Sequence, residues 1–154
     1  GKLDIVMTID YGIGLRADIE TMELDYIQNC VVVTEDHRLA GKASASLKDF
    51  AGDVFIVAGD ESVSPETRFF MNACRNLGIM PQTRQVTDDR TRQLWVESCF
   101  GVAMLNVENS ICQSPGLKYI KLTDVPNSRL VLAWKKDSRN SSLHLFPHTA
   151  SCCL

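Results

Sequence analysis

Three groups of residues have the types and spacing needed to bind a small molecule. Ligands in α/β folds collect at the carboxyl ends of strands and at helix N-termini, where free N–H groups favour anions. The first group, at the end of the first predicted strand, is Thr8, Ile9 and Asp10. The other two lie before predicted helices: Ser62, Ser64, Pro65, Glu66 and Thr67 before the first, and Thr87, Asp88 and Asp89 before the second. Acids at positions 10, 60, 61, 66, 88 and 89 would oppose an anion, which favours a cationic, zwitterionic or neutral ligand.

Structural roles compete with ligand binding at several of these positions. Ser64 and Asp88 are good helix N-caps, and capping is a full alternative explanation for both. Aspartate is common in turns, and Asp10 lies two residues before Gly12, so a turn is the structural alternative for this residue. The sequence therefore nominates these residues for a binding site and leaves the structural alternative open.

Other kinds of chemistry have no support in the sequence. Gly12-Ile13-Gly14 lacks the third glycine of a dinucleotide fingerprint, and no nucleophile elbow is present. The cysteines at positions 30, 74, 99, 112, 152 and 153 show no metal-ligand spacing, so we expect them to be reduced and mostly buried. Cys74 has no second cysteine placed for a thiol switch. We expect no catalytic residue, no metal and no cofactor.

Composition limits the class of protein. The 154 residues are 45% hydrophobic and 23% charged, which is ordinary for one globular domain. A net charge of −3 argues against direct binding to nucleic acid. The apolar runs are too short to cross a bilayer, so we expect no membrane contact. The first residues lack the layout of a secretory leader, which indicates either a cytoplasmic protein, the location we expect, or a leader that was already removed.

Short apolar strands alternate with helical patterns along the chain. Strands are predicted at 3–9, 26–33, 54–58, 83–86, 102–105, 117–122 and 130–135. One helix is predicted from the Ser64 cap to a left-handed stop at Gly78, another from Asp88 or Asp89 to about Ser98, and a third near Ser141. This order predicts an α/β fold with largely parallel sheets.

Six phrases in the chain resemble the effector-binding domain of LysR-type transcriptional regulators. In chain order they are Leu3-Asp4-Ile5-Val6, Val31 to Ala40, Ser46 to Phe50, Phe69 to Pro81, Gln93 to Leu105, and Leu130 to Asp137 with Asn140. Arg38 departs from the pattern, since proline is usual after the histidine at that position. Each phrase alone is weak, but six in the right order cover nearly the whole chain.

The resemblance implies a type 2 periplasmic-binding-protein-like fold of two α/β lobes with the effector between them. Residues 26–122 correspond to the second lobe, and residues 1–25 and 123–154 to a truncated first lobe. The winged helix-turn-helix has no counterpart. The three nominated groups would line the cleft between the lobes.

The function implied by the resemblance is sensing of a small-molecule effector that controls DNA binding and transcription. DNA contact would come only through the missing N-terminal domain. Assembly into a homo-oligomer is also expected. An extracytoplasmic solute-binding protein of a transporter is the alternative, because the fold would be shared.

Overall fold

The computed structural model describes residues 5–139, which form short strands, two α-helices and three 3₁₀ turns. The strands are β1 (Val6–Ile9), β2 (Ile19–Ile27), β3 (Asn29–Thr34), β4 (Ser44–Ala45), β5 (Val54–Ala58), β6 (Gln82–Val86), β7 (Ala103–Asn106), β8 (Leu117–Leu122) and β9 (Ser128–Lys135). The helices are α1 (Pro65–Asn76) and α2 (Asp89–Glu97), and the 3₁₀ turns are η1 (Ile13–Leu15), η2 (Leu47–Phe50) and η3 (Ser110–Gln113).

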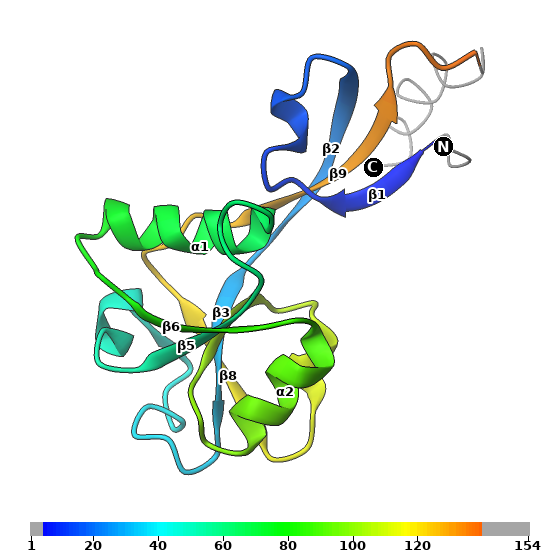
Figure 1. The fold of residues 1–154 in the computed structure, drawn as a ribbon. Helices are drawn as coiled ribbons and strands as arrows, with labels where there is room; N and C mark the ends of the chain where they lie inside the picture. The colour runs from blue at the N-terminus through cyan, green and yellow to red at the C-terminus, as the bar shows by residue number, and fades with distance from the viewer. Residues whose placement is uncertain (1–4, 140–154) are drawn as a thin grey trace. The chain divides into compact units, whose positions relative to one another are not determined.

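The chain divides into two compact units (Figure 1). Residues 27–127 form the larger unit, and the described residues on either side, 5–26 and 128–139, form the smaller one. The equation of these units with the two lobes of an effector domain stays a prediction.

Strand β3 is the centre of the larger unit. It lies in a sheet of order β4-β8-β3-β7, where Val31 is opposite Met104 on one side and Ile120 on the other. Alternate residues point to opposite faces, so Val31 and Val33 enter one hydrophobic cluster while Cys30 and Val32 enter another. The continuous apolar run of β3 thus reflects burial on both faces of the sheet.

The two helices cover opposite faces of these strands (Figure 1). Phe70 of α1 packs against Phe55 of β5, with ring centroids 4.7 Å apart, in the first cluster. Val96 of α2 is fully buried in the second. The predicted end of α1 is confirmed: Gly78 has a φ of 70°, and the N–H of Ile79 bonds back to the Cys74 carbonyl.

A single residue joins the two sheets of the larger unit. Strands β5 and β6 form a parallel pair of their own, and Val102, just before β7, bridges to β5. The N–H of Val102 donates to the Val54 carbonyl and the N–H of Ile56 donates to the Val102 carbonyl, both at 2.8 Å. Gly101 lies against this joint, where a Cβ would be 2.3 Å from the Val54 carbonyl oxygen.

The smaller unit is a three-stranded sheet of order β1-β9-β2. Strand β9 lies in the middle and pairs antiparallel with β1, with Leu132 opposite Met7. The indole N–H of Trp134 donates to Glu20 at 3.0 Å across this sheet. Within its described residues the unit has no α-helix, and the helix predicted near Ser141 lies outside them.

Two predictions about the strands are wrong. The sheets are not largely parallel, since β1/β9, β3/β7 and β3/β8 are antiparallel and only β4/β8 and β5/β6 are parallel among the described pairs. A continuous apolar run indicates that a strand is buried on both faces, but it does not decide whether the strand pairs parallel or antiparallel with its neighbours. The predicted strand at 26–33 is instead the end of β2 and the whole of β3, separated by Gln28. Of the strand predicted at 3–9, the described part begins at Val6.

No helix among residues 5–139 is long and apolar enough to cross a membrane.

Candidate functional site

The N-terminus of α1 is capped by a side chain of the helix start itself. The Ser64 hydroxyl accepts the N–H of Thr67 at 3.2 Å, and Pro65 occupies the first turn. The Thr67 hydroxyl donates to the Gly59 carbonyl at 3.1 Å, which ties the helix to the end of β5. The predicted capping role of Ser64 is therefore confirmed, while a role in ligand binding stays a prediction.

The N-terminus of α2 is also capped by a side chain, and here the capping residue is charged. Asp88 accepts the N–H of Thr91 at 2.8 Å and the hydroxyl of Thr87 at 2.9 Å. The backbone bond from Thr91, followed by the bond from Thr87, lowers the pKa of the Asp88 carboxyl below its usual value. Asp88 thus stays ionised as a cap, and its role toward a ligand is again untested.

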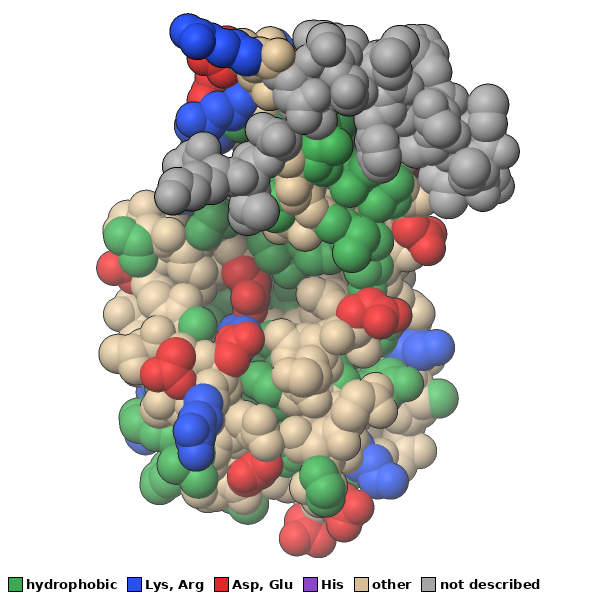
Figure 2. Space-filling model, turned by 90° about the vertical axis from the view of Figure 1, so that its right-hand side faces the viewer, with side chains coloured by type: hydrophobic (Ala, Val, Ile, Leu, Met, Phe, Trp, Pro, Cys, Tyr) green, Lys and Arg blue, Asp and Glu red, His purple; other side chains and the backbone are tan. Residues whose placement is uncertain are grey.

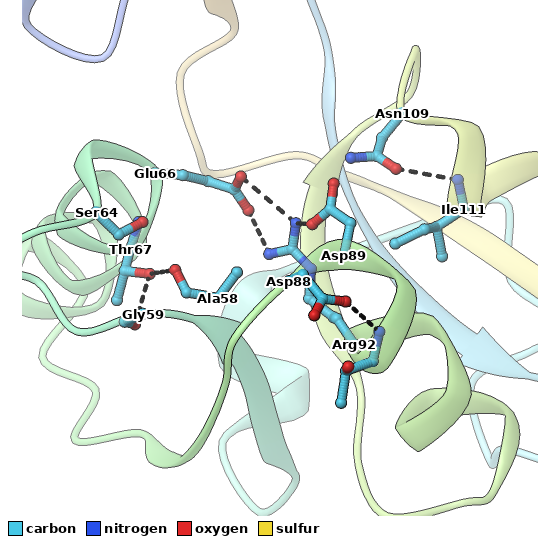
Figure 3. A network of polar contacts seen from close by, with 11 residues as sticks. Ala58, Gly59, Ser64, Glu66, Thr67, Asp88, Asp89, Arg92, Asn109 and Ile111 are labelled. Carbon is cyan, nitrogen blue, oxygen red and sulfur yellow. Dashed lines mark hydrogen bonds and ion pairs between the residues drawn. The ribbon is translucent and has the colours of Figure 1, made fainter.

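Arg92 links the starts of the two helices. Its guanidinium forms ion pairs with Glu66 in the first turn of α1 and with Asp89 in the first turn of α2 (Figure 3). The Arg92 side chain is 2% exposed, whereas those of Glu66 and Asp89 are 32% and 56% exposed. Burial by itself would lower the pKa of Arg92, but the two carboxylates raise it above its ordinary value. The residue is therefore a buried, permanent cation.

This arrangement leaves one polar atom without a partner. The Nε of Arg92 is buried and makes no hydrogen bond to any described residue. Two carboxylates around one guanidinium carry a net charge of −1, and their exposed oxygens are acceptors. The edge formed by the starts of α1 and α2 therefore suits hydroxyl or ammonium donors.

Ser62 lies in the turn before α1 and is bonded locally. Its N–H donates to Asp60 at 2.8 Å, and its hydroxyl donates to the same carboxylate. A hollow of about 220 Å³ beside this turn is lined by Val57, Asp60, Glu61, Thr67, Met71, Thr83 and Gln85. A hollow of about 410 Å³ is an open depression on α2, lined by Arg90, Thr91, Gln93, Leu94 and Glu97. Neither hollow is lined by Glu66 or Arg92.

Thr8, Ile9 and Asp10 belong to the smaller unit. The first two are in β1, and the Thr8 hydroxyl bonds to the Ile9 carbonyl at 3.4 Å. Asp10 accepts the N–H groups of Gly12 and Gly14 at 3.0 and 3.2 Å and forms an ion pair with Arg129. The expected turn at Asp10 is confirmed, and a site shared by these residues and the helix starts stays a prediction.

Asp10 gives a prediction about pH. Burial favours a raised pKa, but the bonds from Arg129, Gly14 and Gly12 outweigh it and bring the pKa below 3.8. A carboxyl with a lowered folded-state pKa stabilises the fold above the unfolded pKa, and this contribution disappears as the pH falls through the folded value. We expect NMR titration of the Asp10 carboxyl to give a midpoint below 3.8, and Arg129→Gln to move it upward. A midpoint at or above 3.8 in the unchanged chain would contradict the assignment.

Arg92 was not identified from the sequence. The acids near the helix starts were considered there, but not the cation that pairs with them. A usable signal was present: Asp89 and Arg92 are three residues apart in the first turns of a predicted helix, a spacing that brings the side chains together. The pairing with Glu66, 26 residues earlier, has no such local signal. Within the described residues no group of three or more metal-ligating side chains forms a metal site.

Comparison with known proteins agrees with the resemblance seen in the sequence. The LysR substrate binding domain family matches residues 1–146. The chain is 28% identical over 141 residues to the HTH-type transcriptional regulator ShiR of Corynebacterium glutamicum (strain R), covering 90% of this chain and 47% of that protein. It therefore spans about half the length of this curated relative.

Two solved structures have the same fold. The effector-binding domain of QuiR in complex with shikimate gives a TM-score of 0.75 at 21% identity, covering 97% of this chain and 70% of that one. HinK, a LysR family transcriptional regulator from Pseudomonas aeruginosa, gives 0.76 at 21% identity, covering 98% and 53%. The mixed α/β architecture with several small sheets is thus that of LysR effector-binding domains, a non-enzymatic family. The chain belongs to the LysR substrate binding domain family.

Proposed function

We propose that this chain is the effector-sensing part of a bacterial LysR-type transcriptional regulator, with a type 2 periplasmic-binding-protein-like fold. Residues 26–122 would be its second lobe, and residues 1–25 and 123–154 a short first lobe. The effector would lie between the lobes and contact Thr8, Ile9, Asp10, Ser62, Ser64, Pro65, Thr67 and Asp88. The family match over residues 1–146 supports this proposal, and so does the shikimate complex of the similar QuiR domain.

The bridge from Glu66 through Arg92 to Asp89 is the observation that carries the proposal. It brings two helix N-termini together and leaves carboxylate oxygens exposed beside them. Such an edge favours an effector that presents hydroxyl or ammonium donors to the carboxylates. An amine meets this requirement through its charge. A polyhydroxylated acid such as shikimate would meet it through its hydroxyl groups only, with its own carboxylate turned away from this edge.

Sensing would work by a shift of population. An effector that binds one arrangement of the lobes better than another stabilises that arrangement by its difference in affinity. In the cytoplasm, within a homo-oligomer of the whole regulator, this shift would change how a separate DNA-binding domain meets its operator. On the face of the larger unit in Figure 2, basic side chains stand singly rather than in a broad patch.

Calorimetric titration of the 154-residue chain tests the proposal. We expect saturable binding of at least one ligand from three probe classes: shikimate, the neutral amino acids and the polyamines. Glu66→Gln should weaken that binding about tenfold, or about 1.4 kcal/mol, through the loss of a charged acceptor. Glu97→Gln is the matched control, because it removes the same charge from the C-terminal end of α2 and should leave the affinity unchanged.

Two results would count against the proposal. Absence of binding across all three classes by a folded chain would contradict the sensing function. Equal losses in Glu66→Gln and Glu97→Gln would move the site away from the helix starts. The transporter alternative has no observation in its favour here, since the family match is to regulators.

A further inference from the structure

Two buried cysteines that are far apart in the sequence lie in contact. The Sγ atoms of Cys30 and Cys112 are 3.6 Å apart, and 82 positions separate the residues. Cys30 is fully buried and Cys112 is 5% exposed. The sequence predicted buried, reduced cysteines but had no signal for this pair, because no local spacing brings them together.

The two sulfurs belong to elements of different kinds, a strand and a 3₁₀ turn. Cys30 is in β3, where it pairs with Leu105 on one side and Lys121 on the other. Cys112 is in η3, a single turn whose N-terminus is capped by Asn109 at 3.0 Å from the N–H of Ile111. A disulfide needs an S–S length of about 2.05 Å, so the sulfurs must approach by about 1.5 Å. A movement of η3 would leave the hydrogen bonds of the sheet in place, because η3 is not one of its strands.

The hydrogen bonds around the pair make the two thiols unequal. Either thiol can donate in the contact between the two sulfurs, and the S–H of Cys112 also has the Asn106 carbonyl as an acceptor at 3.5 Å. The contact with Cys30 lowers the pKa of Cys112, and the same contact together with burial raises the pKa of Cys30. Cys112 is also the more exposed of the two and lies in a turn outside the sheet, so it is the sulfur that an oxidant would reach first.

The surroundings restrict which oxidant can react. The neighbouring side chains are apolar and include Val32, Ile111 and Leu117. Apolar surroundings disfavour a charged disulfide such as oxidised glutathione more strongly than a small uncharged peroxide. Cys30 also lies near the start of the larger unit, which begins at Ile27. The side-chain amide of the adjacent Asn29 donates to the carbonyl of Pro126, near the other end of that unit, at 2.7 Å.

We propose that Cys30 and Cys112 form a reversible two-electron redox site that hydrogen peroxide converts into an intramolecular disulfide. The Cys112 thiolate attacks one peroxide oxygen, the O–O bond breaks, and the hydroxide released takes up a proton to become water. The resulting Cys112 sulfenic acid is attacked by Cys30, whose proton leaves with the sulfenic hydroxyl as a second water. Two thiols and one peroxide thus give one disulfide and two waters.

Disulfide mapping of the 154-residue chain tests this proposal. The folded chain is treated with stoichiometric hydrogen peroxide, alkylated, denatured, digested and examined by mass spectrometry. We expect a peptide pair joined between Cys30 and Cys112, lacking two hydrogens and released by dithiothreitol. The thermal midpoint of the oxidised chain should rise by several degrees, because the bond closes a long loop in the unfolded state.

Single substitutions separate the two roles. Cys30→Ala should abolish the joined peptide and leave a Cys112 sulfenic acid that dimedone labels, while Cys112→Ala should abolish both. Cys74→Ala is the matched control, since Cys74 is buried in the other cluster, and it should leave the joined peptide in place. If a variant fails to fold, mapping of the unchanged chain still decides. Recovery of Cys30 and Cys112 as free thiols while Cys99 is oxidised, or their pairing with other cysteines, would overturn the proposal.

Discussion

Replacement of Arg92 with alanine is expected to lower the free energy of unfolding of the larger unit by about 3 kcal/mol. The substitution removes a side chain that is 2% exposed and leaves the Glu66 and Asp89 carboxylates without their shared cation. Breaking a buried ion pair on one side typically costs about 3–5 kcal/mol, and the partial exposure of both carboxylates puts this case at the lower end. Urea unfolding followed by circular dichroism measures the loss.

Two further variants show which part of Arg92 matters. Arg90→Ala is the matched control, because Arg90 is on the same helix but exposed, and a change within about 0.5 kcal/mol is expected there. Arg92→Met restores most of the buried stem without the charge, so any loss that remains reflects the ion pairs. An Arg92→Ala chain that unfolds at the same urea concentration as the unchanged chain would rule out a structural role for the bridge.

Replacement of Gly101 with alanine should destabilise the larger unit by about 3 kcal/mol or more. A Cβ at this position would lie 2.3 Å from the Val54 carbonyl oxygen and 2.9 Å from a carbon of Ile56. The carbonyl is backbone and accepts the Val102 N–H, so it cannot move away without breaking the joint between the two sheets. Differential scanning calorimetry should show a clearly lower unfolding temperature.

Gly52→Ala is the appropriate comparison for that substitution. Gly52 is exposed, and a Cβ added there would have no heavy atom within 4 Å beyond its own chain neighbours, so alanine should have little effect. Similar unfolding temperatures for the two variants would mean that β5 and Val102 can separate at low cost. The joint would then contribute little to the larger unit.

Elements with local signals could be predicted from the sequence. Ser64, Pro65 and Gly78 mark both ends of α1, and Asp88 marks the start of α2, because caps and stops depend on neighbouring residues only. Each of these signals lies within one turn of the boundary that it marks, so no knowledge of the rest of the fold is needed to interpret it.

Strand β2 could not be predicted as readily. Its residues, Ile19–Ile27, are partly exposed and contain no continuous apolar run, although Met22 to Tyr26 alternate between apolar and acidic side chains as in a strand exposed on one face. Its position in the sheet depends on β9, which begins about a hundred residues later in the chain. Composition likewise could not predict whether the strands pair parallel or antiparallel, because pairing is decided by contacts between distant segments.

The residues of the candidate site show the same difference between local contacts, which could be predicted, and long-range contacts, which could not. The capping residues were identified because each acts within its own turn, whereas Arg92 was missed because its burial depends on a contact with Glu66 of another helix. The Cys30–Cys112 contact has the same origin, with one residue in β3 and the other in η3. Side chains that act within one turn are readable from sequence, and those that join separate elements are not.

The position of β9 between β1 and β2 sets an order of events during synthesis on the ribosome. Strands β1 and β2 leave the exit tunnel early, but their shared partner is made only after the whole of residues 27–127. The larger unit is continuous in the chain and is expected to fold first, as domains generally do during translation. Until residues 128–135 emerge, β1 and β2 have unpaired edges, which makes this interval the one in which the nascent chain most needs protection from aggregation.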